Sequence, residues 1–113
     1  MSAPVKPVRY GQTLRVRPES FEAYRRAHAA VWPDVLATIA RCNIRNYSIF
    51  HRAGELFAYF EYWGDDFAAD MKAMAADPAT QRWWAVTAPM QEPYADRAPG
   101  DWWSNMEEVF HVD

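Results

Sequence analysis

The chain has 113 residues, of which 50% are hydrophobic and 16% are aromatic, and its net charge is −3 at pH 7. This length predicts a single domain over residues 1–113, and the apolar content excludes a disordered chain. The acidic balance, without any basic run, argues against a nucleic-acid partner.

The same composition indicates a cellular compartment. Cys42 is the only cysteine, so no intrachain disulfide can form, and a reducing compartment is favoured. The segment Met1–Pro7 lacks the apolar stretch of a signal peptide, and no later run is long enough to span a membrane. We therefore expect a cytoplasmic protein without a membrane partner.

The first predicted element is a strand from Val8 to Val16. Its alternating pattern places four residues on one face of the strand: Tyr10, Gln12, Leu14 and Val16. A proline and a glutamate follow shortly after it, and both suit the first turn of a helix.

The stretch from Phe21 to Val35 predicts a helix that carries a histidine on its apolar face. Tyr24 and His28 are four residues apart and therefore lie one turn apart on the same side. They share that side with three apolar residues, Phe21, Val31 and Val35. His28 is either a satisfied core histidine or a shielded imidazole that exchanges a proton near neutral pH. Pro33 predicts a kink or restart of the helix, which then continues to Arg41.

The next segment predicts a β-hairpin. A strand from Ile44 to His51 and a strand from Leu56 to Trp63 flank a short turn that contains a glycine. The first strand is expected to place Arg45, Tyr47, Ile49 and His51 on one face. The second strand is apolar on both faces; helices can cover one, and a second copy of the chain is expected to cover the other. A homodimer is therefore expected.

The remaining elements complete a recognisable order. Helices are predicted from Phe67 to Ala76 and from Pro78 to Met90, followed by a loop from Gln91 to Gly100 and a last strand from Met106 to Val112. The order β-α-β-β-α-β is that of the ferredoxin-like, split βαβ fold. We expect this α+β fold, with a four-stranded antiparallel sheet and helices on one face.

The residues that could carry chemistry are an imidazole and several aromatic rings. The three histidines share no metal-ligand spacing with one another or with Cys42, so no metal site is expected. Trp83 and Trp84 lie about 100° apart around their helix, so at least one should face the sheet. They either fill the core or offer flat apolar surfaces to a sugar ring.

Four blocks occur in this order: Glu22-x-Tyr24-x-Arg26-x-His28-x-x-x-Trp32-Pro33, Asn46-Tyr47-x-Ile49, Gln81-Arg82-Trp83-Trp84 and Glu107-Glu108-Val109-Phe110. Together they resemble the L-rhamnose mutarotase family. The resemblance implies a dimeric ferredoxin-like α/β barrel that interconverts the anomers of 6-deoxy-L-hexoses without a cofactor. It also implies His28 as the catalytic proton donor, and Tyr24, Tyr47, Trp83 and Trp84 as the residues that bind the monosaccharide.

One segment departs from the family pattern. The stretch 98–103 adds two tryptophans, Trp102 and Trp103, which puts the identity of the sugar in doubt. L-fucose leaves a continuous apolar face that an extra indole could cover, so we place it ahead of L-rhamnose. The base for the anomeric hydroxyl is either a tyrosine or a bound water. Two other classes stay open: a cofactor-free monooxygenase or haem-binding dimer of similar fold, with His28 as the haem ligand, and a non-catalytic dimerisation module.

Overall fold

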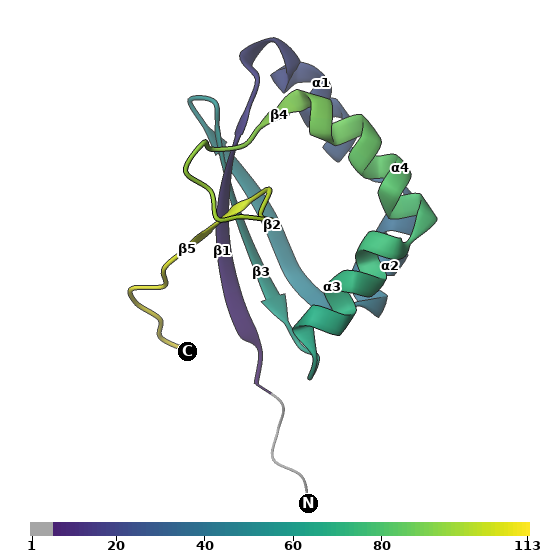
Figure 1. The fold of residues 1–113 in the computed structure, drawn as a ribbon, viewed down its shortest axis with the longest axis vertical. Coiled ribbons are helices and arrows are strands. Elements are labelled where there is room, and N and C mark those ends of the chain that lie inside the picture. The colour runs from purple at the N-terminus through teal and green to yellow at the C-terminus, as the bar shows by residue number, and fades with distance from the viewer. Residues whose placement is uncertain (1–5) are drawn as a thin grey trace, which may run out of the picture.

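A curled antiparallel sheet and a layer of four helices make up residues 6–113, the part of the chain that this computed structural model describes (Figure 1). The expectation for Met1–Pro7 falls largely outside these residues. The strands are β1 (Val8–Val16), β2 (Ile44–Arg52), β3 (Glu55–Tyr62), β4 (Gln91–Glu92) and β5 (Ser104–Met106). The helices are α1 (Phe21–His28), α2 (Pro33–Arg41), α3 (Phe67–Ala76) and α4 (Pro78–Thr87), with short 3-10 turns at Pro18–Ser20 and Ala88–Met90.

The sheet has the strand order of the predicted ferredoxin-like fold. The order is β2-β3-β1-β4, and β5 also pairs with β1. Strand β5 pairs with Gly11–Thr13 and β4 pairs with Arg15–Val16, so the two short strands lie one after the other along the same strand, β1. Together they take the fourth position of the sheet, and the α+β architecture is confirmed.

The C-terminal part of the sheet differs from the prediction. Strand β4 lies inside the segment expected to be a loop, and the last strand covers Ser104–Met106 rather than Met106–Val112. Val109 and Phe110 are 88% and 79% exposed. No other part of residues 6–113 covers these side chains, so continued pairing along the edge of β1 would gain little apolar burial.

All four helices lie on one face of the sheet, as expected (Figure 1). Strand β3 alternates strictly between buried and less buried residues, and its buried side chains, among them Leu56 and Phe60, face the helices. The other face, which we call the outer face, carries Phe57 and, opposite it on β2, Phe50. No helix among residues 6–113 is both long and apolar enough to cross a membrane.

The first helical region is interrupted where Pro33 predicted a restart. Helix α1 ends at His28, and Trp32 adopts extended backbone angles directly before Pro33 begins α2. Val31 therefore lies in the link rather than on the helical face assigned to it, although it still packs against the core cluster that contains Val35. The break places His28 at the end of a helix.

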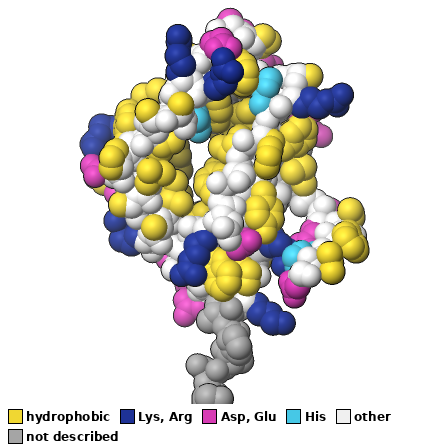
Figure 2. Space-filling model, turned by 180° about the vertical axis from the view of Figure 1, so that it is seen from behind, with side chains coloured by type: hydrophobic (Ala, Val, Ile, Leu, Met, Phe, Trp, Pro, Cys, Tyr) yellow, Lys and Arg dark blue, Asp and Glu magenta, His cyan; other side chains and the backbone are white. Residues whose placement is uncertain are grey.

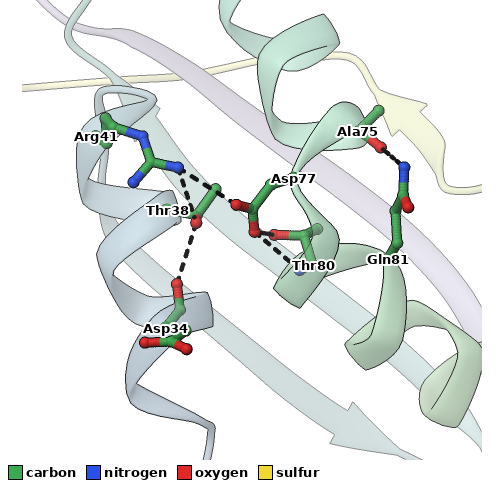
Figure 3. Close-up of polar contacts among 7 residues, drawn as sticks. All are labelled: Asp34, Thr38, Arg41, Ala75, Asp77, Thr80 and Gln81. Carbon is green, nitrogen blue, oxygen red and sulfur yellow. Dashed lines mark hydrogen bonds and ion pairs between the residues drawn. The ribbon is translucent and has the colours of Figure 1, made fainter.

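Polar contacts join α2 to the beginning of α4 (Figure 3). The Asp77 carboxylate accepts hydrogen bonds from the backbone N–H and the hydroxyl of Thr80, both at 2.9 Å, and thereby caps α4. These bonds lower the pKa of Asp77. Arg41 donates to Asp77 at 3.5 Å and to the hydroxyl of Thr38 at 3.2 Å. These contacts fix the position of α4, which carries two predicted site residues.

Candidate active site

A cavity of about 530 Å³ lies between the helix layer and the sheet. Figure 2 shows the hollow from behind, with hydrophobic side chains on its walls. All five predicted site residues line this one cavity: Tyr24, His28, Tyr47, Trp83 and Trp84. Among residues 6–113, no group of three or more His, Cys, Asp or Glu side chains is arranged to hold a metal ion.

His28 is held from its own helix. Its Nδ1 lies 2.8 Å from the carbonyl oxygen of Tyr24, which can only accept, so Nδ1 carries a proton. Its ring lies 4.2 Å from that of Tyr24 and meets Trp83 edge-on at 5.3 Å, measured between ring centroids. The second nitrogen, Nε2, has no partner among residues 6–113. It can accept a proton when the ring is neutral and donate one when the ring is charged.

Tyr24 is among the most deeply buried polar groups of the cavity, with 3% of its surface exposed. Its hydroxyl oxygen accepts a hydrogen bond from Nε2 of Gln91 at 3.1 Å. Burial raises the pKa of Tyr24, and the bond from Gln91 opposes this in part. The phenol therefore keeps its proton at neutral pH, which argues against Tyr24 as the base.

Tyr47 reaches the cavity because of a β-bulge in β2. Three residue steps from Arg45 to Ser48 on β2 match two steps from Glu61 to Tyr59 on β3, so β2 contains one extra residue. Asn46 has a φ of 52° there. The prediction that Arg45 shares a face with Tyr47 is therefore wrong, because the bulge reverses the alternation between them.

The two tryptophans of α4 differ in burial. Trp83 is 7% exposed, belongs to a core cluster with Val35, and meets Trp32 edge-on at 5.2 Å. Trp84 is 43% exposed. Since both also line the cavity, Trp83 combines core packing with a place in the wall, and Trp84 offers free ring surface to a ligand.

Several polar residues of the cavity were not predicted. Gln91 is 7% exposed, and its Oε1 accepts a hydrogen bond from the indole nitrogen of Trp102 at 2.8 Å. Gln12 donates to Asn105 at 2.9 Å, and Asp101 also lines the cavity. Most of these residues come from the segment after α4, where no helical or strand periodicity marks a site. The two added tryptophans were its one visible signal.

Comparison with known proteins identifies relatives over nearly the whole chain. Residues 9–112 match the family described as L-rhamnose mutarotase. An L-rhamnose mutarotase from Ligilactobacillus salivarius is 32% identical over 111 residues, covering 94% of this chain and 98% of that protein. One from Lactiplantibacillus plantarum is 30% identical over 108 residues, covering 94% and 99%.

Solved structures agree with the fold. A crystal structure of an L-rhamnose mutarotase from Formosa agariphila has a TM-score of 0.73 and 23% identity, covering 94% of this chain and 99% of that one. The tetracenomycin F2 cyclase from Streptomyces glaucescens has a TM-score of 0.67 and 18% identity, with the same coverage. At these identities, the two structures establish only the fold. The sequence matches establish more: the chain belongs to the L-rhamnose mutarotase family of isomerases.

Proposed function

We propose that this protein interconverts the α and β anomers of a 6-deoxy-L-hexose, with His28 as the proton donor. The observation that carries the proposal is the state of the His28 ring. One nitrogen is fixed by a backbone carbonyl, the other has no partner among residues 6–113, and the ring lies on the wall of a cavity with aromatic side chains. An imidazole held in this way can give and take a proton without turning.

The reaction needs two proton transfers. Nε2 of His28 gives its proton to the ring oxygen of the sugar, the bond from C1 to that oxygen breaks, and the anomeric hydroxyl loses its proton as the aldehyde forms. Rotation about the bond between C1 and C2 presents the other face of the carbonyl. Closure reverses both transfers: the hydroxyl that closes the ring returns its proton to Nε2, the base returns a proton to the C1 oxygen, and the opposite anomer forms.

A water molecule is the base we propose for the anomeric hydroxyl. Tyr24 keeps its proton because burial raises its pKa. The cavity of about 530 Å³ has room for water, of which each molecule takes about 30 Å³, beside a pyranose ring. Tyr24 instead donates its proton to a sugar oxygen, and Tyr47, Trp83 and Trp84 hold the apolar surfaces of the ring.

The choice between the two sugars depends on Trp102. The expectation that L-fucose comes first assumed that an added indole covers an apolar sugar face. The indole N–H of Trp102 donates to Gln91, so that residue also has a polar role. The relatives described above are named for L-rhamnose, so we propose L-rhamnose as the preferred substrate and L-fucose as the comparison.

We also propose that the protein works as a homodimer joined through its outer face. Phe50 is 65% exposed on that face and lies directly opposite Phe57. The C-terminal side chains Val109, Phe110 and Val112 are at least 72% exposed. A soluble monomer rarely leaves so much apolar surface uncovered, and a second copy supplies a cover of matching chemistry.

The proposed function is tested by NMR saturation transfer between the anomers of each sugar. The purified protein is expected to speed exchange of L-rhamnose above the rate in buffer, and to act on L-fucose more slowly. Faster exchange of L-fucose would reverse the order of the two sugars. Absence of any effect on both would refute the proposed function.

A further inference from the structure

Gln91 connects two aromatic residues that lie on different parts of the cavity wall. It is the first residue of β4 and is 7% exposed. Its amide nitrogen donates to the Tyr24 hydroxyl at 3.1 Å, and its amide oxygen accepts from Trp102 Nε1 at 2.8 Å. Both ends of this buried amide are therefore engaged, one by helix α1 and one by the segment that departs from the family pattern.

The chemistry of the indole fixes the direction of these bonds. An indole N–H can donate but cannot accept, so the amide of Gln91 must turn its oxygen towards Trp102. Its nitrogen then faces Tyr24, whose oxygen must accept. The hydroxyl proton of Tyr24 is not used in this bond, and it has no other partner among residues 6–113.

Trp102 is itself held in place on its other side. The guanidinium carbon of Arg97 lies 5.9 Å from the centre of the Trp102 ring, within the range of a cation–π contact. Arg97 also donates to the carbonyl oxygen of Tyr94 at 3.0 Å. The indole is thus positioned by its own segment before any ligand binds.

We propose that Trp102 and Gln91 are positioning residues that make the Tyr24 hydroxyl a hydrogen-bond donor towards the cavity. Without the indole N–H, the Gln91 amide is free to turn over and to accept the Tyr24 proton. Tyr24 would then present no donor to a ligand. The nature of the ligand, a sugar hydroxyl or ring oxygen, rests on the function proposed above.

A double-mutant cycle tests the connection. Trp102→Phe keeps an aromatic ring and removes the N–H, and we expect it to raise KM for L-rhamnose by about 3- to 10-fold, the usual effect of one hydrogen bond. Tyr24→Phe should raise KM as well. If the indole acts through Tyr24, adding Trp102→Phe to Tyr24→Phe should change KM by less than about 2-fold. If the effects of Trp102→Phe and Tyr24→Phe on KM simply multiply in the double variant, the proposal is wrong.

Trp103→Phe is the matched control for the cycle. It makes the same change one residue away, at an indole nitrogen that has no hydrogen-bond partner among the described residues. The Trp103 ring packs against the core cluster that contains Tyr24, so any coupling to Tyr24→Phe reports packing without the N–H and should be clearly weaker than that of Trp102→Phe. If Trp103→Phe is coupled to Tyr24→Phe as strongly as Trp102→Phe, the specific role of the Trp102 N–H is refuted.

A measurement without sugar separates this inference from the proposed function. The Trp102 indole N–H signal in a ¹H–¹⁵N spectrum is assigned by its loss in Trp102→Phe. Gln91→Leu removes the acceptor and should move that signal upfield while the other indole signals stay near their positions. An unmoved Trp102 signal would overturn the inference at any level of activity. Wild-type protein that exchanges no 6-deoxy-L-hexose would instead refute the proposed function.

Discussion

Replacement of His28 by alanine tests the centre of the proposed mechanism. A general acid or base contributes about 10²- to 10⁴-fold to a rate, and a tenfold change corresponds to about 1.36 kcal/mol. His28→Ala should therefore raise the barrier by about 2.7–5.4 kcal/mol. His28→Gln keeps an amide that can hydrogen-bond but cannot exchange a proton at neutral pH, so it should lose nearly as much activity.

The same replacement should cost far less in stability. His28 makes one hydrogen bond to its own helix and contacts two rings, Tyr24 and Trp83. The bond is worth about 1 kcal/mol and each ring contact about 0.5–1.5 kcal/mol, whereas alanine recovers about 0.5 kcal/mol in helix propensity. The net loss of about 1.5–3.5 kcal/mol lies below the 5–15 kcal/mol by which domains are usually stable.

The assay compares anomer exchange by saturation transfer with the midpoint of urea unfolding, both at pH 7. His51→Ala is the matched control, because His51 stacks on Phe21 at 3.8 Å, accepts from the Gly54 backbone N–H, and lies outside the cavity lining. It should retain wild-type exchange. A folded His28→Ala protein with wild-type exchange would refute the mechanism, and an unfolded one would support a core role for the histidine.

Three further predictions concern assembly and stability. Phe50→Glu, at a side chain that is 65% exposed, should convert the proposed dimer to a folded monomer in light scattering; a persistent dimer would place the interface elsewhere. Gly64→Ala should lower the free energy of unfolding by about 1–3 kcal/mol, because the new methyl group would overlap the Tyr62 hydroxyl and approach the Asp70 carboxylate within 2.8 Å; equal urea midpoints would contradict this. Hydrogen bonds from Tyr62, the larger effect, and from Asn43 lower the pKa of Asp70. The ionised carboxylate therefore stabilises the fold above the ordinary aspartate pKa of about 3.9, and this stabilisation is lost as pH falls through the lowered value. Asp70→Asn should therefore be less stable than wild type at pH 7, with a difference that shrinks on acidification to pH 3; a constant difference would exclude the charge as its cause.

Local chemistry made much of the fold predictable. Strand β1 begins and ends at the expected residues, Val8 and Val16. Its signals are local in the sequence: the alternating pattern of the strand and the proline that follows its end. The helix breaks at Pro33 because proline has no backbone N–H to donate and restricts the backbone angles of the preceding residue, Trp32. The four quoted blocks carried the family assignment, and the five site residues they implied line one cavity; their roles stay predictions.

The features that were missed depend on contacts between distant segments. The end of β5 depends on how far it pairs with the edge of β1. The sequence around Val109 does not indicate whether another segment will cover that side chain. The hydrogen bond from Gln91 to Tyr24 joins residues 67 positions apart, and the sequence around either residue does not predict this contact. The sequence marked Trp102 as a departure from the family pattern. Its polar contact with Gln91 could not be predicted, because it depends on how the last loop folds back.

The extra residue in the bulge at Asn46 shifts the alternation of β2 by one position for every residue that follows it. Ile44, before it, and Tyr47, after it, both face the helices although they are three positions apart. Deletion of Asn46 would force the strand to choose a single phase, losing either the core contact of Ile44 or the cavity wall of Tyr47. An insertion outside the stretch between Ile44 and Tyr47 could not compensate for this deletion, because the two side chains would still face opposite sides. We therefore expect this strand to tolerate substitutions far better than changes in length.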